Sequence, residues 1–349
     1  MALISKKKRI YSIKNHLRNF LVKYHRETEL PIQYKDLLRY DNTIPLRDRN
    51  DKDTLWETVF YPQSDMQQIH DDVKKIYAML KADGDLSVMQ HLYVDRIDLC
   101  VYGNTLPFRI RVKNRVNDNF DYFYIKVADA SRVYGLELEH LLSPNRISYL
   151  VDRDTLVEQH IIGVPGDQFM KQYLDDPNLN KTRLAKEFVK FNERCFIRLL
   201  GDMHSSNFVV NITPDFEDVE YRIRAIDFDQ QSYEGKKTIY LPQFFKENNP
   251  LIEIGLQCMT VETVKQYQKE ERSLIARRYR VSKEEVTDLL RAMSSDEISP
   301  PEYVDKLGKD LAKHYQDDEF IQCKTMGDLV KRSLDKALED KRVYKFPYH

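Results

Sequence analysis

The sequence has little cysteine, little glycine and no long apolar run, and each scarcity narrows what the protein can be. Its four cysteines are too far apart to form a CxxC pair, which argues against a zinc site and a disulfide framework and favours a reducing, cytoplasmic setting. No apolar run approaches the roughly 20 residues of a membrane-spanning helix, so no membrane span is expected. These features are typical of a globular protein of the cytoplasm.

An excess of charge of either sign is also missing. The formal net charge is −1, because 55 lysines and arginines nearly balance 56 aspartates and glutamates, and no nucleic-acid partner is therefore predicted. Hydrophobic residues make up 42% and charged residues 32% of the chain, an ordinary balance for a globular protein. A length of 349 residues is sufficient for two lobes, each with its own core.

The first part of the chain, residues 1–90, is expected to form a helical N-terminal extension. Residues 4–26 show apolar side chains at helical spacing with a basic opposite face. We interpret them as an amphipathic helix docked on the protein, with a membrane or nucleic-acid contact as the alternative. Residues 40–65 are polar and lack periodicity, which predicts a long loop. A second amphipathic helix then stops at Gly84.

The pattern changes near residue 92 to short strands and later to helices, which predicts an α+β fold. Strand-like runs lie at 92–102, 106–112 and 121–128, followed by a helix at 131–142 with Ser131 as its N-cap and by strands at 147–151 and 155–161. Further on, the predicted elements are a helix at 181–200, strands at 207–212 and 221–226, and helices near 261–278, 283–293, 302–315 and 325–340.

Two short motifs contain the residue types that phosphoryl transfer requires. The first, LLGDMHSSNFVV at 199–210, links a predicted helix to a predicted strand and places Asp202 and Asn207 where both can face one cavity. The second, AIDFD at 225–229, has Asp227 at the end of a predicted strand. Phosphoryl transfer needs a carboxylate that receives the proton of the acceptor hydroxyl, and oxygen ligands for Mg²⁺. The two motifs therefore predict one phosphotransfer site.

GDMHSSN followed by IDFD resembles the motifs of the aminoglycoside phosphotransferase and choline kinase branch of the protein-kinase-like superfamily. The resemblance implies a bilobal fold, with a small antiparallel-sheet N-lobe that carries one helix and a larger, mainly helical C-lobe. The corresponding domains would be 91–162 and 163–349. It further implies that Asp202 is the catalytic base, that Asn207 and Asp227 bind Mg²⁺, and that His204 has a structural role.

The resemblance also requires a lysine on the third strand of the N-lobe and a helix glutamate that holds it. Lys126 in FYIKVAD fits the first requirement, since it points away from both of its apolar neighbours. Glu137 shares the sheet-facing side of the next helix and is favoured as the partner, with Glu139 as the alternative.

The resemblance places ATP between a hinge and the first hairpin of the predicted N-lobe. The segment LVEQHIIGVPGDQF at 156–169 resembles the kinase hinge, so backbone groups near Glu158 and His160 would hold the adenine. The hairpin offers Gly103 and Asn104 to cover the phosphates, in place of a full glycine-rich loop.

The metal motif itself departs from the common pattern, because it reads Asp-Phe-Asp where protein kinases have Asp-Phe-Gly. Asp229 is therefore either an additional metal ligand, a carboxylate that supports a metal ligand, or an ordinary solvated carboxylate.

The predicted activity is the ATP- and Mg²⁺-dependent transfer of the γ-phosphoryl group to a hydroxyl acceptor. A small-molecule acceptor is favoured, because no substrate platform of a protein kinase is recognisable. The alternatives are an atypical Ser/Thr protein kinase and a catalytically weak nucleotide-binding scaffold of the pseudokinase type. A further alternative is an enzyme that binds ATP in the flipped orientation and transfers its nucleotidyl group.

Overall fold

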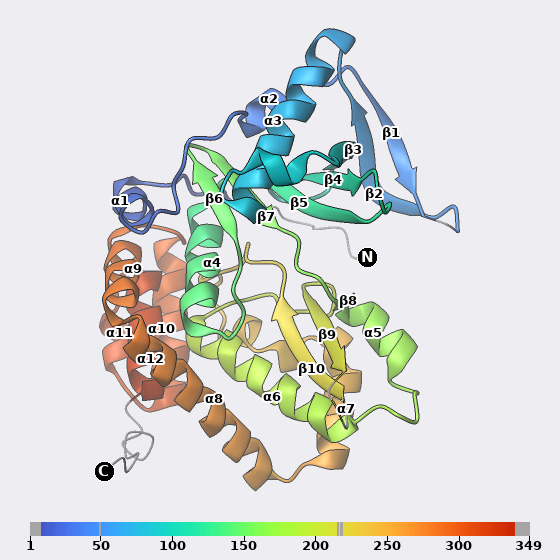
Figure 1. The fold of residues 1–349 in the computed structure, drawn as a ribbon. Coiled ribbons are helices and arrows are strands. Elements are labelled where there is room, and N and C mark those ends of the chain that lie inside the picture. The colour runs from blue at the N-terminus through green and yellow to red at the C-terminus, as the bar shows by residue number, and fades with distance from the viewer. Residues whose placement is uncertain (1–7, 49, 215, 217–218, 339–349) are drawn as a thin grey trace, which may run out of the picture. The chain divides into compact units, whose positions relative to one another are not determined.

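A computed structural model describes residues 8–338, except for residues 49, 215, 217 and 218. The fold is α+β, as predicted, and the chain divides into two compact units (Figure 1). Unit 1 comprises residues 1–130 and 147–160, and unit 2 comprises residues 131–146 and 161–349. Within the described part of the chain, no helix combines the length and apolar character needed to cross a membrane.

Unit 1 is built on a seven-stranded antiparallel sheet with the strand order β1-β2-β3-β4-β5-β7-β6. Its strands are β1 (Asn42–Arg47), β2 (Asp53–Phe60), β3 (Leu92–Cys100), β4 (Phe108–Asn114), β5 (Phe120–Val127), β6 (Tyr149–Asp152) and β7 (Thr155–Gln159). The predicted strands around 92–161 are all present. The sheet is larger than expected because β1 and β2 extend it.

The prediction of a long loop over residues 40–65 is wrong. β1 and β2 form a hairpin, and β2 joins the sheet through Trp56–Thr58 opposite β3. Most of β1 is exposed on both faces, so no alternation of apolar and polar residues marks it in the sequence. Pro45 is tolerated because β1 is the edge strand. The description of residues 1–90 as helical therefore fails at this hairpin.

Unit 1 also contains helices, which are α1 (Asn15–Lys23), α2 (Tyr34–Leu37), α3 (Gln63–Ala82) and the short 3₁₀ helix η1 (Leu86–Met89). Of these, α2 contacts β5 and α3 contacts β3. α1 is shorter than the predicted 4–26, since residues 8–14 are not helical and residues 1–7 lie outside the described part. Its apolar face is buried. α3 contributes Ile69, Val73 and Ile76 to the same core as Ile110 and Phe123 of the sheet.

Unit 2 is mainly helical and contains a three-stranded sheet with the order β10-β9-β8. Its strands are β8 (Val164–Pro165), β9 (Phe208–Pro214) and β10 (Val219–Ala225). Its principal helices are α4 (Ala130–Leu142), α5 (Gly166–Tyr173), α6 (Lys181–Arg198), α7 (Asn249–Cys258), α8 (Val261–Val281), α9 (Lys283–Ser295), α10 (Pro301–Tyr315), α11 (Glu319–Gln322) and α12 (Met326–Leu338). The helices predicted near 181–200 and 261–340 are confirmed over their described residues.

Ser131 is not the N-cap of α4, contrary to the prediction. The helix already begins at Ala130, and the Ser131 hydroxyl donates a hydrogen bond to the carbonyl of Gln231. This bond joins α4 to the chain immediately after the AIDFD motif. Both residues belong to unit 2, so the contact lies within one compact unit.

Candidate functional site

The loop that contains Asp202 begins where α6 ends. Leu199 has φ +53° and Asp202 has φ +62°, so two residues adopt the left-handed conformation that non-glycine residues seldom take. Gly201 lies between them because a Cβ there would be 3.0 Å from the carbonyl oxygen of Gln230. The N–H of Asp202 donates to the carbonyl of Ile239 at 3.0 Å. These constraints fix the position of Asp202.

Asn207 closes the same loop through its side chain. Its amide Nδ2 donates to the carbonyl of Asp202 at 2.8 Å, which leaves Oδ1 as the group that can accept or ligate. Its own carbonyl accepts from the N–H of Ile226, one residue before Asp227. The structure therefore brings the two sequence motifs together in unit 2, with Asn207 as the link between them.

Asp227 follows the end of β10 and has a buried cationic neighbour that the sequence did not reveal. Arg132 of α4 donates from Nη1 to Oδ1 of Asp227 and to Oδ1 of Asp229, each at 2.8 Å. The N–H of Asp229 also donates to Oδ1 of Asp227 at 3.0 Å. Asp229 is thus an ion-pair partner, and it is not simply a solvated carboxylate. No local signal in the sequence marks Arg132.

The surroundings of Asp202 raise the pKa of its carboxyl group above that of an ordinary aspartate. Burial raises its pKa, the charge of His204 lowers it, and the negative charges of Asp227, Glu234 and Glu247 raise it further, to about 6. A carboxyl group with such a pKa can exchange a proton near neutral pH.

The segment after the second motif supports the Asp202 loop from another side. Asn248, which is fully buried, donates from Nδ2 to the carbonyl of Met203 at 2.9 Å. Gln231 donates from Nε2 to the carbonyls of Arg198 and Leu199. The loop backbone is therefore held by side chains from two later segments of unit 2.

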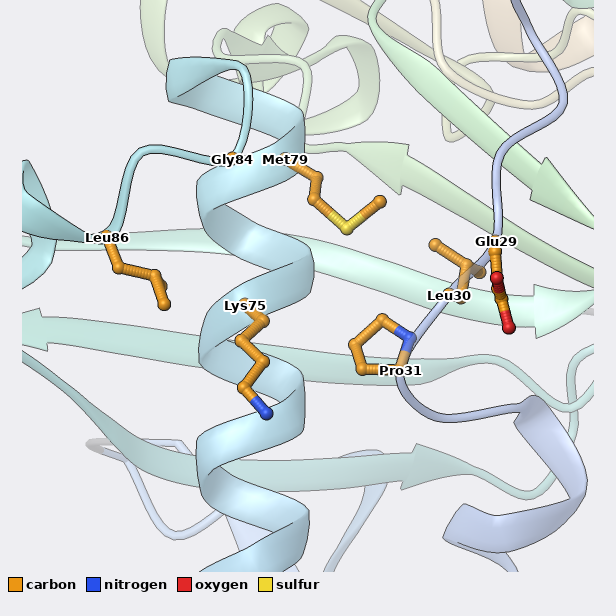
Figure 2. Close-up of a pocket in the computed structure, with 7 residues that line it drawn as sticks. All are labelled: Glu29, Leu30, Pro31, Lys75, Met79, Gly84 and Leu86. Atoms are coloured by element: carbon orange, nitrogen blue, oxygen red, sulfur yellow. The ribbon is translucent and has the colours of Figure 1, made fainter.

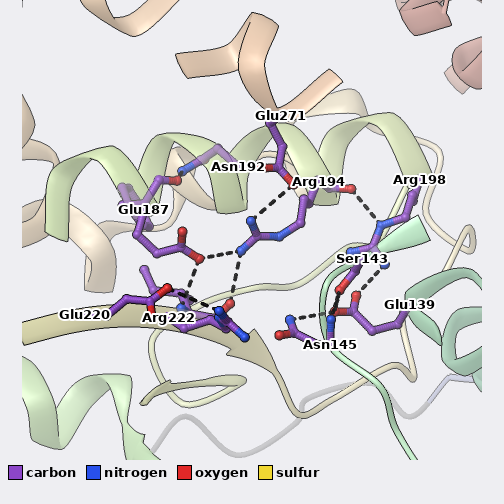
Figure 3. A network of polar contacts seen from close by, with 12 residues as sticks. Glu139, Ser143, Asn145, Glu187, Asn192, Arg194, Arg198, Glu220, Arg222 and Glu271 are labelled. Atoms are coloured by element: carbon purple, nitrogen blue, oxygen red, sulfur yellow. Dashed lines mark hydrogen bonds and ion pairs between the residues drawn. The ribbon is translucent and has the colours of Figure 1, made fainter. Parts of the chain in front are cut away.

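Glu139 is committed to a buried polar network in unit 2 (Figure 3). Its Oε2 accepts from Nη1 of Arg198, and its Oε1 accepts from Ser143 and Asn145. Both carboxylate oxygens are occupied, which disfavours Glu139 as the partner of Lys126. Glu137, the favoured candidate, is fully buried on the same helix.

The network continues along α6 to Arg194. This side chain contacts Glu187 at 2.7 Å and Glu271 of α8 at 3.3 Å, and it is only 3% exposed. The network thus anchors the helix from which the Asp202 loop emerges.

Lys126 lies on β5 of unit 1, where Ile125 and Val127 face the core and Lys126 faces the opposite side. Its Nζ forms a buried ion pair with Oε2 of Glu158 on β7 at 2.8 Å. Leu156 is directly opposite Lys126, so Glu158 is its diagonal neighbour. The prediction assigned only the backbone of Glu158 to a site, and it missed this contact.

The remaining predicted nucleotide-site residues also lie in unit 1. Nδ1 of His160 is 3.1 Å from the hydroxyl of Tyr124. Gly103 is required in its turn, because a Cβ there would be 2.7 Å from Cδ of Pro107. Among the residues that the structure describes, neither polar side-chain atom of Asn104 has a hydrogen-bond partner, although both are buried.

Unit 1 also contains a cavity of about 420 Å³ that none of the predicted residues lines (Figure 2). Its walls come from the segment before α2 and from α3 and the turn after it, and comprise Glu29, Leu30, Pro31, Lys75, Met79, Gly84 and Leu86. Over the described ranges, no group of three or more His, Cys, Asp and Glu side chains is arranged to hold a metal ion. The predicted Mg²⁺ ligands, Asp227 and Asn207, are one carboxylate and one amide, so they do not form such a group of three.

Neither protein-family models nor curated proteins gave a match to the chain.

Proposed function

We propose that the protein is an ATP- and Mg²⁺-dependent phosphotransferase with a protein-kinase-like fold, divided into an N-lobe at 91–162 and a C-lobe at 163–349. The observation that carries the proposal is the link through Asn207. Its amide binds the carbonyl of Asp202 and its carbonyl binds the N–H of Ile226, so the proposed base and the proposed metal ligands belong to one hydrogen-bonded assembly.

The side-chain oxygens of Asn207 and Asp227 are chemically suited to binding a magnesium ion. We assign Oδ1 of Asn207 as one ligand atom, since its Nδ2 donates to the carbonyl of Asp202, and Oδ2 of Asp227 as the other, since its Oδ1 accepts from Arg132 and from the N–H of Asp229. Carboxylate and amide oxygens suit Mg²⁺, which prefers hard oxygen ligands. When bound, the ion would be held by Asn207 and Asp227 and would neutralise negative charge that develops on the transferred phosphoryl group.

Asp202 would act on the acceptor hydroxyl. In the proposed reaction the acceptor oxygen forms a bond to the γ-phosphorus, and the bond from that phosphorus to the bridging oxygen of ADP breaks. The acceptor proton passes to a carboxylate oxygen of Asp202. The raised pKa of about 6 suits this role, because a general base works best when its pKa is near the operating pH.

Lys126 would hold the α- and β-phosphates. Its ion pair with Glu158 holds the ammonium group on the sheet face opposite to Ile125 and Val127. Glu137 is the proposed helix partner of Lys126, since both oxygens of Glu139 bind other groups. Backbone groups near Glu158 and His160, and the turn at Gly103 and Asn104, would complete the nucleotide site.

The test is to follow the label of γ-labelled ATP in the presence of Mg²⁺ and a panel of hydroxyl compounds. We expect transfer by the wild type and its loss in Asp202→Ala, which should still bind ATP. Label on a small molecule supports the proposed acceptor class, and label on the protein itself favours the protein-kinase alternative. Undiminished transfer by Asp202→Ala would remove Asp202 from its proposed role.

A further inference from the structure

We propose that five arginines of unit 2 form a binding site for a compact anion that carries two phosphate groups. We call them the arginine cluster, and its members are Arg146 after α4, Arg222 and Arg224 on β10, and Arg277 and Arg278 on α8. Each of them is at least partly exposed to solvent. The cluster contains none of the residues that we assign to ATP, Mg²⁺ or the acceptor.

Three members of the cluster are adjacent at β10. Arg222 and Arg224 point to the same side of this edge strand, because they are two residues apart, and Ile223 between them is fully buried. Nη2 of Arg224 donates to the carbonyl of Arg146 at 3.2 Å. This bond brings the segment after α4 next to the strand.

The helix α8 is joined to the same strand through Arg194 (Figure 3). Nη2 of Arg194 donates to the carbonyl of Ile223 at 3.1 Å, and its Nη1 lies 3.3 Å from Oε1 of Glu271 on α8. Arg278 follows Glu271 by two helical turns and therefore lies on the same side of α8. The last turn of α8 thus reaches the part of β10 that carries the other arginines.

Few carboxylates neutralise the cluster. Arg222 pairs with Glu220 at 3.2 Å, in an exposed contact of the kind that contributes little. Within the part of the chain that the structure describes, the other four members have no carboxylate at ion-pair distance, and Glu271 is committed to Arg194. The buried Nε of Arg224 also has no hydrogen-bond partner among the described residues. An anionic oxygen would satisfy this donor.

The arginines repel one another when no anion is bound. Burial lowers the pKa of Arg278, the charge of Glu271 raises it, and the charges of three other members of the cluster lower it, with a net decrease. At Arg224, burial and the charge of Arg222 outweigh the charge of Glu139, so its pKa is lowered as well. The charged forms are therefore disfavoured in the ligand-free protein, and an anion would relieve this cost.

The residue type indicates phosphate as the ligand group. A guanidinium presents paired N–H donors that match the oxygens of a phosphate. One phosphate monoester carries about two negative charges at neutral pH, so two phosphate groups balance the four members that lack a carboxylate partner. Members from three separate segments act on the charge of Arg278, which describes a compact group and not a track along which a nucleic acid would lie.

The experiment is a calorimetric titration of the full chain with inorganic pyrophosphate in the absence of divalent metal ions. We expect one pyrophosphate per wild-type chain and an affinity about tenfold weaker in Arg278→Gln, because a charge-assisted contact is lost. Asp227→Ala should bind pyrophosphate as the wild type does. Arg291→Gln is the matched control, since Arg291 forms an exposed ion pair with Asp288 outside the cluster.

The side chain of Arg278 makes no hydrogen bond or ion pair with the described residues, so Arg278→Gln should fold. Its melting temperature without pyrophosphate should equal or exceed that of the wild type, since one repelling charge is gone. A lower melting temperature would instead give Arg278 a structural role and contradict the proposal.

No binding of pyrophosphate by the wild type, or undiminished binding by Arg278→Gln, would overturn the arginine cluster as a site without touching the proposed phosphotransfer. Loss of binding in Asp227→Ala would place the anion at the proposed metal site instead. Vesicles that contain phosphatidylglycerol test a lipid source of the phosphate. Binding to these vesicles that depends on Arg278, without binding of pyrophosphate, would overturn the assignment to a free ligand.

Discussion

At the scale of single residues, the candidate base is held in a conformation that the backbone alone would avoid. Asp202 has a positive φ, and its carboxylate lies near three other acidic groups, Asp227, Glu234 and Glu247. Holding a non-glycine residue in such a conformation costs on the order of 1 kcal/mol, which the surrounding hydrogen bonds must offset. Strain and like charge at one residue are typical of functional positions.

The raised pKa of Asp202 predicts a pH dependence of stability in the ligand-free protein. Between its usual value of 3.8 and about 6, the folded state binds a proton that the unfolded state does not. The contribution of Asp202 to the free energy of unfolding should therefore rise as the pH falls from 7 towards 4. Asp202→Asn lacks this contribution, so its stability relative to the wild type should decrease by on the order of 2 kcal/mol over that range.

Urea unfolding of both proteins at several pH values measures this difference. Parallel stability curves for the wild type and Asp202→Asn would contradict the raised pKa.

The sequence predicted those site residues that lie in short motifs, and it missed those whose partners are distant along the chain. Asp202, Asn207 and Asp227 lie in compact motifs, and their order along the chain suggested one site. Arg132 could not be found in this way, because it lies 95 residues from Asp227 and nothing in its helix marks it. The pair between Lys126 and Glu158 depends on the pairing of β5 with β7, two strands whose paired residues are about 30 positions apart along the chain, so no local motif marks it.

At the scale of elements, the end of α6 is the part of unit 2 on which the Asp202 loop depends. Arg198 is the last residue of the helix, and its buried pair with Glu139 fixes α6 to α4. Burial raises the pKa of Glu139, but Arg198 and the hydrogen bonds of Ser143 and Asn145 outweigh it, so the net pKa is lowered. Glu139 is therefore charged and needs its partner.

Removal of Arg198 should accordingly be costly. Arg198→Met leaves the buried carboxylate of Glu139 without its cation, and we expect a loss of about 3–5 kcal/mol in the free energy of unfolding. The double variant with Glu139→Gln should be less destabilised, because the neutral amide still accepts from Ser143 and Asn145. Chemical denaturation checks both. Equal losses in the single and double variants would show that the cost is unrelated to the orphaned charge.

The elements also show where sequence patterns fail. The hairpin β1–β2 was predicted as a loop because neither strand carries regular alternation, and because β1 is a largely exposed edge strand that contains a proline. The buried strands β4 and β5 and the helices α10 and α12 were predicted well, since each presents a regular apolar face to a core. The spacing of apolar residues in a sequence reflects which side chains are buried. It therefore reveals a helix or strand only where one face of that element is buried and the other is exposed.

At the scale of the whole molecule, the chain forms two compact units whose residues interleave along the sequence. Residues before 91 share the core of unit 1 with the sheet, through Ile69, Val73 and Ile76. The described residues before 91 are thus part of the sheet domain in packing terms. The proposed metal ligands and base lie in unit 2, and Lys126 and the predicted adenine-binding backbone lie in unit 1.

The most direct test of this account is the change in melting temperature that ATP and Mg²⁺ cause in the full chain. A ligand that binds only the folded state must stabilise it, by about 2.7 kcal/mol at 100 times its dissociation constant. We predict a rise that requires both ATP and Mg²⁺ in the wild type and in the exposed-site control Asp305→Ala, and that disappears in Asp227→Ala. The absence of any rise in the wild type would contradict the proposed nucleotide site, as would an undiminished rise in Asp227→Ala.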